Sequence, residues 1–237
     1  MDPEITSVLL TSTVKYDTKA TTKSSDTLKS DIINAISSYN TNTLQKFDSI
    51  YRHSKLTGII DGVDNSVLSN ITTVKIRKSF TPTLATSTKY NIYFRNALFN
   101  PHAGHNSAAG GILSSTGFKV TGNDNEMFFD DDGNGNVRRY FLQSGIKSYA
   151  NETQGTIDYK TGAITLNSLN VASISNIRGA TSTVIELTIT PDSNDVVPVR
   201  DQIVEIDIAN SNITVTADSF VGGSADAGVG YTTTSSY

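Results

Sequence analysis

The sequence of 237 residues contains no cysteine and no tryptophan. Without cysteine the chain has no disulfide, no thiolate nucleophile and no cysteine metal ligand, which fits assembly in a reducing cytoplasm. Only 18% of the residues are charged, compared with about 25% in an average domain. Serine, threonine and asparagine are plentiful instead, so the composition favours strands and hydrogen-bonded loops and excludes the enzymes that depend on cysteine.

Positive charge and long apolar runs are also scarce. The formal net charge is -4, whereas a phosphate-binding surface needs clustered lysine and arginine. The basic cluster 75–78 is typical of a solvated strand, because its charges alternate between the two faces. No run of about 18 apolar residues occurs, and the acidic start lacks the pattern of a signal peptide. We therefore expect no nucleic acid and no membrane among the partners.

The first 80 residues predict a small strand, helix and strand layer. Residues 5–16 place Val8, Leu10, Val14 and Tyr16 on one face at a period of two, which predicts a strand. Ser25 or Asp26 can then cap a helix, and 72–78 again resembles a strand. Between them, 44–52 fits a strand or a helix, and 54–68 indicates short helical turns. The apolar stripe of the predicted helix comprises Leu28, Ile32, Ala35, Ile36 and Tyr39.

Beyond Pro82 the pattern changes to short strands separated by turn residues, which predicts a mostly antiparallel sheet, sandwich or barrel. The sequence predicts two β-hairpins, one joining 127–129 to 137–141 and one joining 156–159 to 163–166. Gly162 suits a positive φ in the second turn. The predicted fold class is α+β, with an α+β module at 1–80, a β-rich domain at 81–220 and a flexible tail at 221–237.

The segment from Asp130 to Gly135 matches the first half of a calcium loop, with oxygen ligands at Asp130, Asp132 and Asn134. The match stops at Phe141, which stands where a bidentate glutamate is needed. We interpret the segment as an acidic hairpin tip whose residues provide turn geometry. Calcium binding is the alternative, and no cofactor is expected.

No catalytic set is complete. His102 and His105 could approach one metal ion, but no carboxylate or third histidine is near in sequence, so we interpret them as loop residues. The sequence has no G-x-S-x-G elbow. Glu205 and Asp207 would lie on one face of a strand, where a paired-carboxylate glycosidase remains an alternative. We predict no enzymatic activity.

Ordered motifs suggest a family. The chain resembles the C-terminal region of the baseplate wedge proteins of contractile-tailed, T4-like bacteriophages, which are related to the baseplate J-like family. The resemblance covers most of residues 5–208. The segments that carry it are 14–17, 36–40, 44–56, 60–61, 98–105, 115–118, 129–135 and 155–162.

This resemblance implies a structural subunit of the ring around the central hub of a tail baseplate, located in the virion and assembled in the host cytoplasm. Its implied partners are further copies of itself, in dimer and ring contacts, and other wedge proteins. Such proteins are much longer, so we expect a fragment, a split gene product or a shared module. No catalytic residue is implied.

A ring needs at least two adhesive surfaces. We predict one on the helix and the segment after it, carried by Leu28, Ile32, Ile36, Tyr39, Phe47 and Tyr51. The alternative function is a glycan-binding tail-fibre or adhesin domain, and a cell-wall hydrolase is a third.

Overall fold

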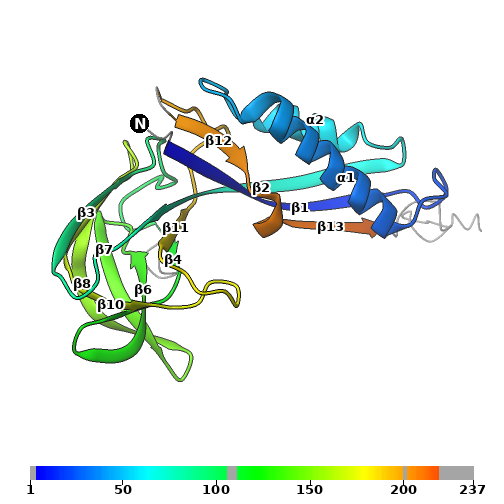
Figure 1. Cartoon of the computed structure of the whole chain (residues 1–237). Coiled ribbons are helices and arrows are strands. Elements are labelled where there is room, and N and C mark those ends of the chain that lie inside the picture. Colours follow the sequence, from blue (N-terminus) through cyan, green and yellow to red (C-terminus); the bar gives the residue numbers. More distant parts are fainter. Residues whose placement is uncertain (1–3, 106–110, 200–201, 219–237) are drawn as a thin grey trace, which may run out of the picture.

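The computed structural model describes residues 4–105, 111–199 and 202–218, and the predicted tail at 221–237 lies outside them. The chain is mostly β-sheet with two helices, in broad agreement with the predicted α+β class. Figure 1 shows two parts: an elongated arm, in which helices lie against one sheet, and a lobe built from a second sheet.

The arm is built on two long antiparallel strands, β1 (Glu4–Tyr16) and β2 (Val67–Phe80). On its other side β1 pairs in parallel with two later strands, β12 (Gln202–Ile206) beside residues 4–8 and β13 (Asn212–Ala217) beside residues 11–16. The lobe end of β2 pairs with β11 (Ile185–Ile189), which in turn pairs with β4 (Leu113–Ser115). Residues far apart in the sequence therefore complete one six-stranded sheet.

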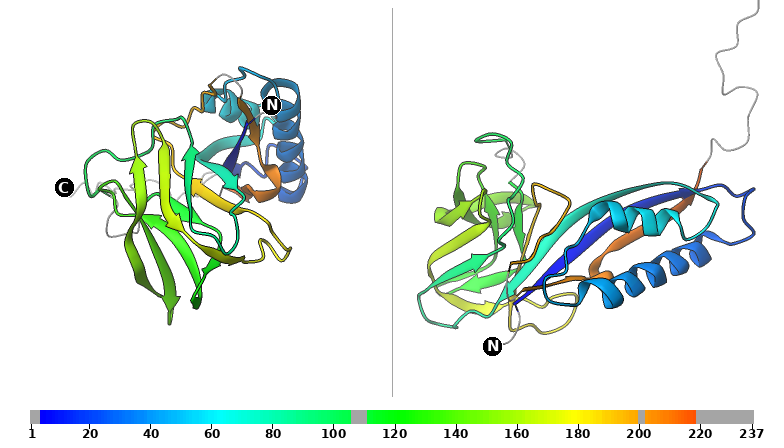
Figure 2. Two further views of the ribbon diagram at one scale, coloured as in Figure 1. Left: turned by 60° about the vertical axis from the view of Figure 1, so that its left-hand side comes forward. Right: turned by 90° about the horizontal axis from the view of Figure 1, so that it is seen from above.

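Two helices lie against the arm sheet, α1 (Ser25–Tyr39) and α2 (His53–Asp61), and Figure 2 shows both on the same side of it. A π-helical turn at Asn40–Leu44 continues α1, and a 3-10 turn at Ile208–Asn210 joins β12 to β13. The period-two face predicted for β1 is confirmed, because Val8, Leu10, Val14 and Tyr16 are all buried. The cap of α1 is one residue earlier than predicted: the hydroxyl of Ser24 accepts the N–H of Thr27.

The lobe contains a seven-stranded antiparallel sheet in the order β10-β5-β6-β7-β8-β9-β3. Both predicted hairpins are confirmed by the pairing of β6 with β7 and of β8 with β9, and Gly162 has a φ of +68°. The strands are β3 (Thr88–Tyr93), β5 (Phe118–Val120), β6 (Asn123–Asp131), β7 (Asn136–Gln143), β8 (Ile146–Asp158), β9 (Ala163–Leu169) and β10 (Val171–Ile174).

Several expectations differ from the structure. Residues 44–52 form neither a regular strand nor an α-helix but the end of the π-helical turn and isolated bridges at Phe47 and Tyr51. The helical turns expected at 54–68 are one helix, α2, and β2 already begins at Val67. Across the predicted boundary at residue 80, β4, β11, β12 and β13 return to the arm sheet. No helix in the described part of the chain is long and apolar enough to span a bilayer.

Candidate functional site

The six residues predicted to form a contact surface divide sharply by exposure. Five of them are buried, and all of these except Leu28 belong to the hydrophobic core that α1 shares with the arm sheet. Phe47, in contrast, is 60% exposed. The five residues that stabilise this chain itself, and so leave the predicted surface, are Leu28, Ile32, Ile36, Tyr39 and Tyr51.

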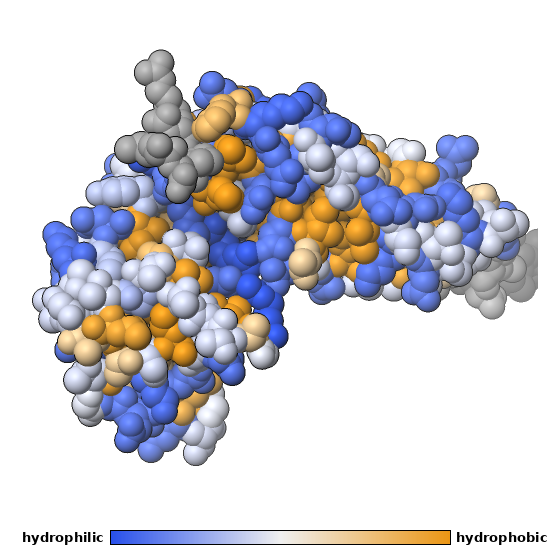
Figure 3. Space-filling model, in the orientation of Figure 1, coloured by the Kyte–Doolittle hydropathy of each residue, from blue (hydrophilic) through white to orange (hydrophobic). Residues whose placement is uncertain are grey.

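Large apolar side chains reach solvent at several separate places. Figure 3 shows hydrophobic patches between polar ones on both the arm and the lobe. The most exposed are Ile146, 73% exposed at the β7–β8 hairpin tip, and Ile71, 70% exposed on β2. Leu142 is also exposed on that hairpin, and Leu68 is exposed near Ile71. These positions, with Phe47, are the candidate contact surfaces of the described chain.

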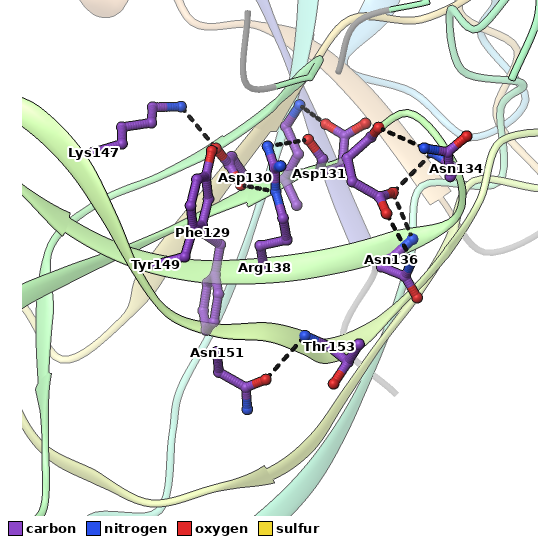
Figure 4. A network of polar contacts seen from close by, with 12 residues as sticks. Phe129, Asp130, Asp131, Asn134, Asn136, Arg138, Lys147, Tyr149, Asn151 and Thr153 are labelled. Atoms are coloured by element: carbon purple, nitrogen blue, oxygen red, sulfur yellow. Dashed lines mark hydrogen bonds and ion pairs between the residues drawn. The ribbon is translucent and has the colours of Figure 1, made fainter. Parts of the chain in front are cut away.

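The acidic hairpin tip is held together by its own side chains (Figure 4). Asp130 is 1% exposed, and its carboxylate accepts hydrogen bonds from three groups. These are Nε of Arg138 at 2.9 Å, Nζ of Lys147 at 2.7 Å and the hydroxyl of Tyr149 at 3.0 Å. Burial and the nearby Asp130 raise the pKa of Tyr149 to about 12. The two cations also lie over aromatic rings, Arg138 over Tyr149 and Lys147 over Tyr140.

The next two carboxylates have different partners. Asp131 is fully buried; its Oδ1 accepts the backbone N–H groups of Ile112 and Leu113 at 2.7 and 2.8 Å, and its Oδ2 accepts the hydroxyl of Tyr159 at 2.6 Å. Asp132 accepts the N–H groups of Asn134 and Asn136. Burial raises the pKa of Asp132, but hydrogen bonds from Asn136 and Asn134 outweigh it and lower the pKa overall. The segment thus has the turn role that we predicted.

The acidic hairpin also gathers three other motif segments. The loop 98–105 reaches its tip, because the amide of Asn100 and the N–H of Gly104 both donate to the carbonyl of Gly133. The segment 115–118 contacts it through Ser115, whose hydroxyl accepts the N–H of Phe129. From 155–162, Ile157 N–H donates to the carbonyl of Gly135. Hydrogen bonds therefore bring together four motifs that are separate in the sequence, and these bonds help to hold the lobe together.

The residues considered for metal binding or catalysis are the two loop histidines and the carboxylates of Glu205 and Asp207. His102 and His105 lie close together, with Nδ1 of His105 3.0 Å from Nε2 of His102. Within the described ranges, no three His, Asp or Glu side chains are grouped as metal ligands would be. Asp207 follows the end of β12, and its carboxylate pairs with Arg77 and accepts the amide of Asn210 at 2.7 Å. Asp207 is thus engaged by Arg77 and Asn210, and the register places Arg77 and Glu205 on either side of Ser7 in the sheet.

Sequence reasoning missed the residue that fixes the end of α1. The side chain of Asn40 is buried and bonds twice to the backbone of Ile206: its Oδ1 accepts the N–H at 2.8 Å and its Nδ2 donates to the carbonyl at 3.1 Å. This pairing ties the helix end to β12. An asparagine directly after an apolar helical stripe was the signal available in the sequence.

Residues 5–79 match the family described as baseplate structural protein gp6, C-terminal domain III. The matched stretch runs from β1 through both helices to the penultimate residue of β2, so it covers the layered core of the arm. No curated protein matches the chain significantly. The family match supports a structural role in a baseplate.

Proposed function

We propose that this chain is a structural subunit of a phage tail baseplate wedge. In this proposal it helps to form the ring around the central hub through self-association and contacts with other wedge proteins. The observation that carries the proposal is the family match over residues 5–79. It favours a structural over a catalytic role and does not favour the alternative of a glycan-binding tail-fibre domain.

The arrangement of the chain is consistent with a scaffold. The titratable side chains that we considered for chemistry are occupied by internal partners, as in the Asp130 cluster. The exposed apolar residues lie far apart on the arm and on the lobe hairpin, where they are available to separate neighbours. Two or more distinct contact surfaces are what a ring subunit requires.

Immunogold labelling tests this function directly. An antibody raised against the purified chain should label the baseplate end of intact tails in negative-stain electron micrographs. Labelling of fibre tips alone, or no labelling of particles that contain the chain by mass spectrometry, would contradict the proposal. A glycan array is the companion control, because a ring subunit should bind no glycan on it.

A further inference from the structure

Two of the three histidines of this chain lie side by side on one loop. His102 and His105 are both exposed, and their rings meet edge to face with centroids 4.7 Å apart. Nε2 of His102 lies 3.0 Å from Nδ1 of His105. The sequence predicts two loop residues without a shared role, whereas the structure places their ring nitrogens in direct contact.

A tight turn brings the two rings together. The N–H of His105 donates to the carbonyl of His102 at 3.1 Å, which closes a four-residue turn. Gly104, at the third position of this turn, has a φ of +74°, and a type II turn requires a positive φ there. The first and fourth residues of such a turn have neighbouring Cα atoms. The H-x-x-H spacing therefore places both imidazoles on the same side of the loop end.

Contacts with the acidic hairpin hold the turn in position. Nδ2 of Asn100 and the N–H of Gly104 both donate to the carbonyl of Gly133, at 3.2 and 2.9 Å. The ring of Phe99 also lies edge to face with that of His105, with centroids 5.5 Å apart. The backbone that carries the two histidines is thus supported before any ligand arrives, which lowers the entropy cost of binding one.

The hydrogen bonds of His102 show which of its ring nitrogens has a free lone pair. Nδ1 of His102 lies 3.2 Å from the carbonyl oxygen of Ala103. A carbonyl only accepts, so in the neutral ring Nδ1 carries the hydrogen and Nε2 has the lone pair. Nδ1 of His105 therefore donates to Nε2 of His102. Metal-binding histidines share this arrangement, because they donate their second ring N–H to a carbonyl or carboxylate that orients the ring.

The pair suits a divalent transition metal. Imidazole nitrogen is a ligand for Zn²⁺, Cu²⁺ and Ni²⁺, whereas Mg²⁺ and Ca²⁺ prefer oxygen. Two nitrogens bound to one tetrahedral Zn²⁺ at about 2.0–2.1 Å are about 3.3–3.4 Å apart. The rings have to separate by a few tenths of an ångström and turn until both lone pairs meet at the metal. Both side chains are exposed, so no buried packing opposes this movement.

We propose that His102 and His105 form a binding site for a divalent transition metal such as Zn²⁺, with Nε2 of His102 and Nδ1 of His105 as the protein ligands. On binding, the ring hydrogen of His105 moves from Nδ1 to Nε2, so both ligands are neutral and no net proton is released. No third His, Asp or Glu side chain is grouped with the pair in the described part of the chain, so water completes the coordination. The site does not depend on the proposed baseplate role.

Isothermal titration calorimetry of the chain without a histidine tag tests the site. The native chain should bind one Zn²⁺ per molecule. His102→Ala and His105→Ala should each weaken binding about tenfold or more, because even the loss of an outer-shell contact costs about 10–100-fold. His53→Gln removes the only other histidine and should bind Zn²⁺ like the native chain. Equal affinity of the native chain and the two alanine variants would overturn the proposal.

The acidic hairpin provides the second comparison. Ca²⁺ and Mg²⁺ should neither bind nor displace Zn²⁺, because the proposed ligands are nitrogens. Asp132→Asn should leave Zn²⁺ binding unchanged. Zn²⁺ binding that survives the double substitution of His102 and His105 by alanine but is lost in Asp132→Asn would place the ion on the hairpin and contradict the histidine site.

NMR spectra of the histidine rings identify the ligand atoms in the native chain, so this test does not depend on how a variant folds. Zn²⁺ should shift the nitrogen signals of Nε2 of His102 and Nδ1 of His105, and the ring N–H of His105 should change from Nδ1 to Nε2. The signals of His53 should stay where they are. Unchanged signals of His102 and His105 at saturating Zn²⁺ would show that the pair binds no metal.

Discussion

A carboxylate that is 1% exposed, as that of Asp130 is, must be neutralised by its neighbours. Arg138, Lys147 and Tyr149 do this from two adjacent strands, so the cluster ties β7 and β8 to β6. The aromatic rings of Tyr140 and Tyr149 support the same cations. The acidic segment therefore holds three neighbouring strands of the lobe sheet together.

Asp130→Ala should lower the free energy of unfolding by about 3–5 kcal/mol, because it leaves two cations without their buried partner. Urea denaturation followed by circular dichroism measures the loss. Asp124→Ala, at an exposed position of the same strand, is the control and should change stability by less than about 0.5 kcal/mol. Equal effects of the two substitutions would show that the cluster contributes nothing to the free energy of unfolding.

Gly162→Ala should destabilise the chain more than Gly122→Ala. Both glycines have a positive φ, +68° and +84°, which costs an alanine roughly 1 kcal/mol. At Gly162 a Cβ atom would also lie 2.4 Å from the carbonyl oxygen of Asn96, whereas at Gly122 it would meet nothing within 4 Å. Thermal melts of the two variants give the comparison, and equal melting temperatures would contradict the predicted clash.

At the scale of elements, α1 is fixed at both ends by side chains. Ser24 caps its first turn, and Asn40 bonds to the backbone of β12 beyond its last turn. Between these ends, Ile32, Ile36 and Tyr39 belong to the same hydrophobic core as the buried residues of the arm sheet. The helix is thus positioned by polar contacts at its ends and held by apolar contacts along its length.

Ser24→Ala should cost about 1 kcal/mol of stability, because the N–H of Thr27 loses its acceptor. Ser25→Ala is the matched control, since Ser25 is already the first residue of the helix and the cap comes from Ser24. Chemical denaturation at neutral pH distinguishes them. A larger loss of stability for Ser25→Ala than for Ser24→Ala would indicate that Ser25 is the cap, as predicted from the sequence.

Periodicity explains which elements the sequence could predict. Alternation identified β1 through Val8, Leu10 and Val14, and helical spacing identified α1. The strands β4, β10 and β13 have six residues or fewer, which is too short for a clear alternation. An apolar stripe shows that a helix face is covered but not what covers it. The sequence therefore predicted a partner protein on this face of α1, whereas the arm sheet of the same chain buries it. Exposure is a tertiary property.

At the scale of the molecule, ion pairs between distant segments link stability to pH. The side chain of Arg52, followed by the N–H of His53, lowers the pKa of Asp195, and the ion pair Arg52–Asp195 measures 2.7 Å. Hydrogen bonds from Ser66 lower the pKa of Asp64 to about 2. Both carboxylates are therefore deprotonated more easily in the folded chain than in the unfolded one.

The chain should lose stability as the pH falls below about 4. A folded pKa below the unfolded value, about 3.9 for aspartate, gives stability that is present above pH 4 and disappears as the carboxylate is protonated. Thermal melts between pH 7 and pH 2 should show this decline, and Asp195→Asn should show a shallower one. A constant melting temperature across this range would contradict the assignment.

The neighbours of β1 have a consequence for how the chain is made. Its parallel partners, β12 and β13, lie some 200 residues later in the sequence. At about 5–20 residues per second, ribosomes need roughly 10–40 s to deliver them after β1 has emerged. Until then the helices and β2 can assemble on β1, but one flank of that strand stays open. Completion of the arm is thus a late step, and for that interval the newly made chain depends on avoiding premature pairing at the open flank of β1.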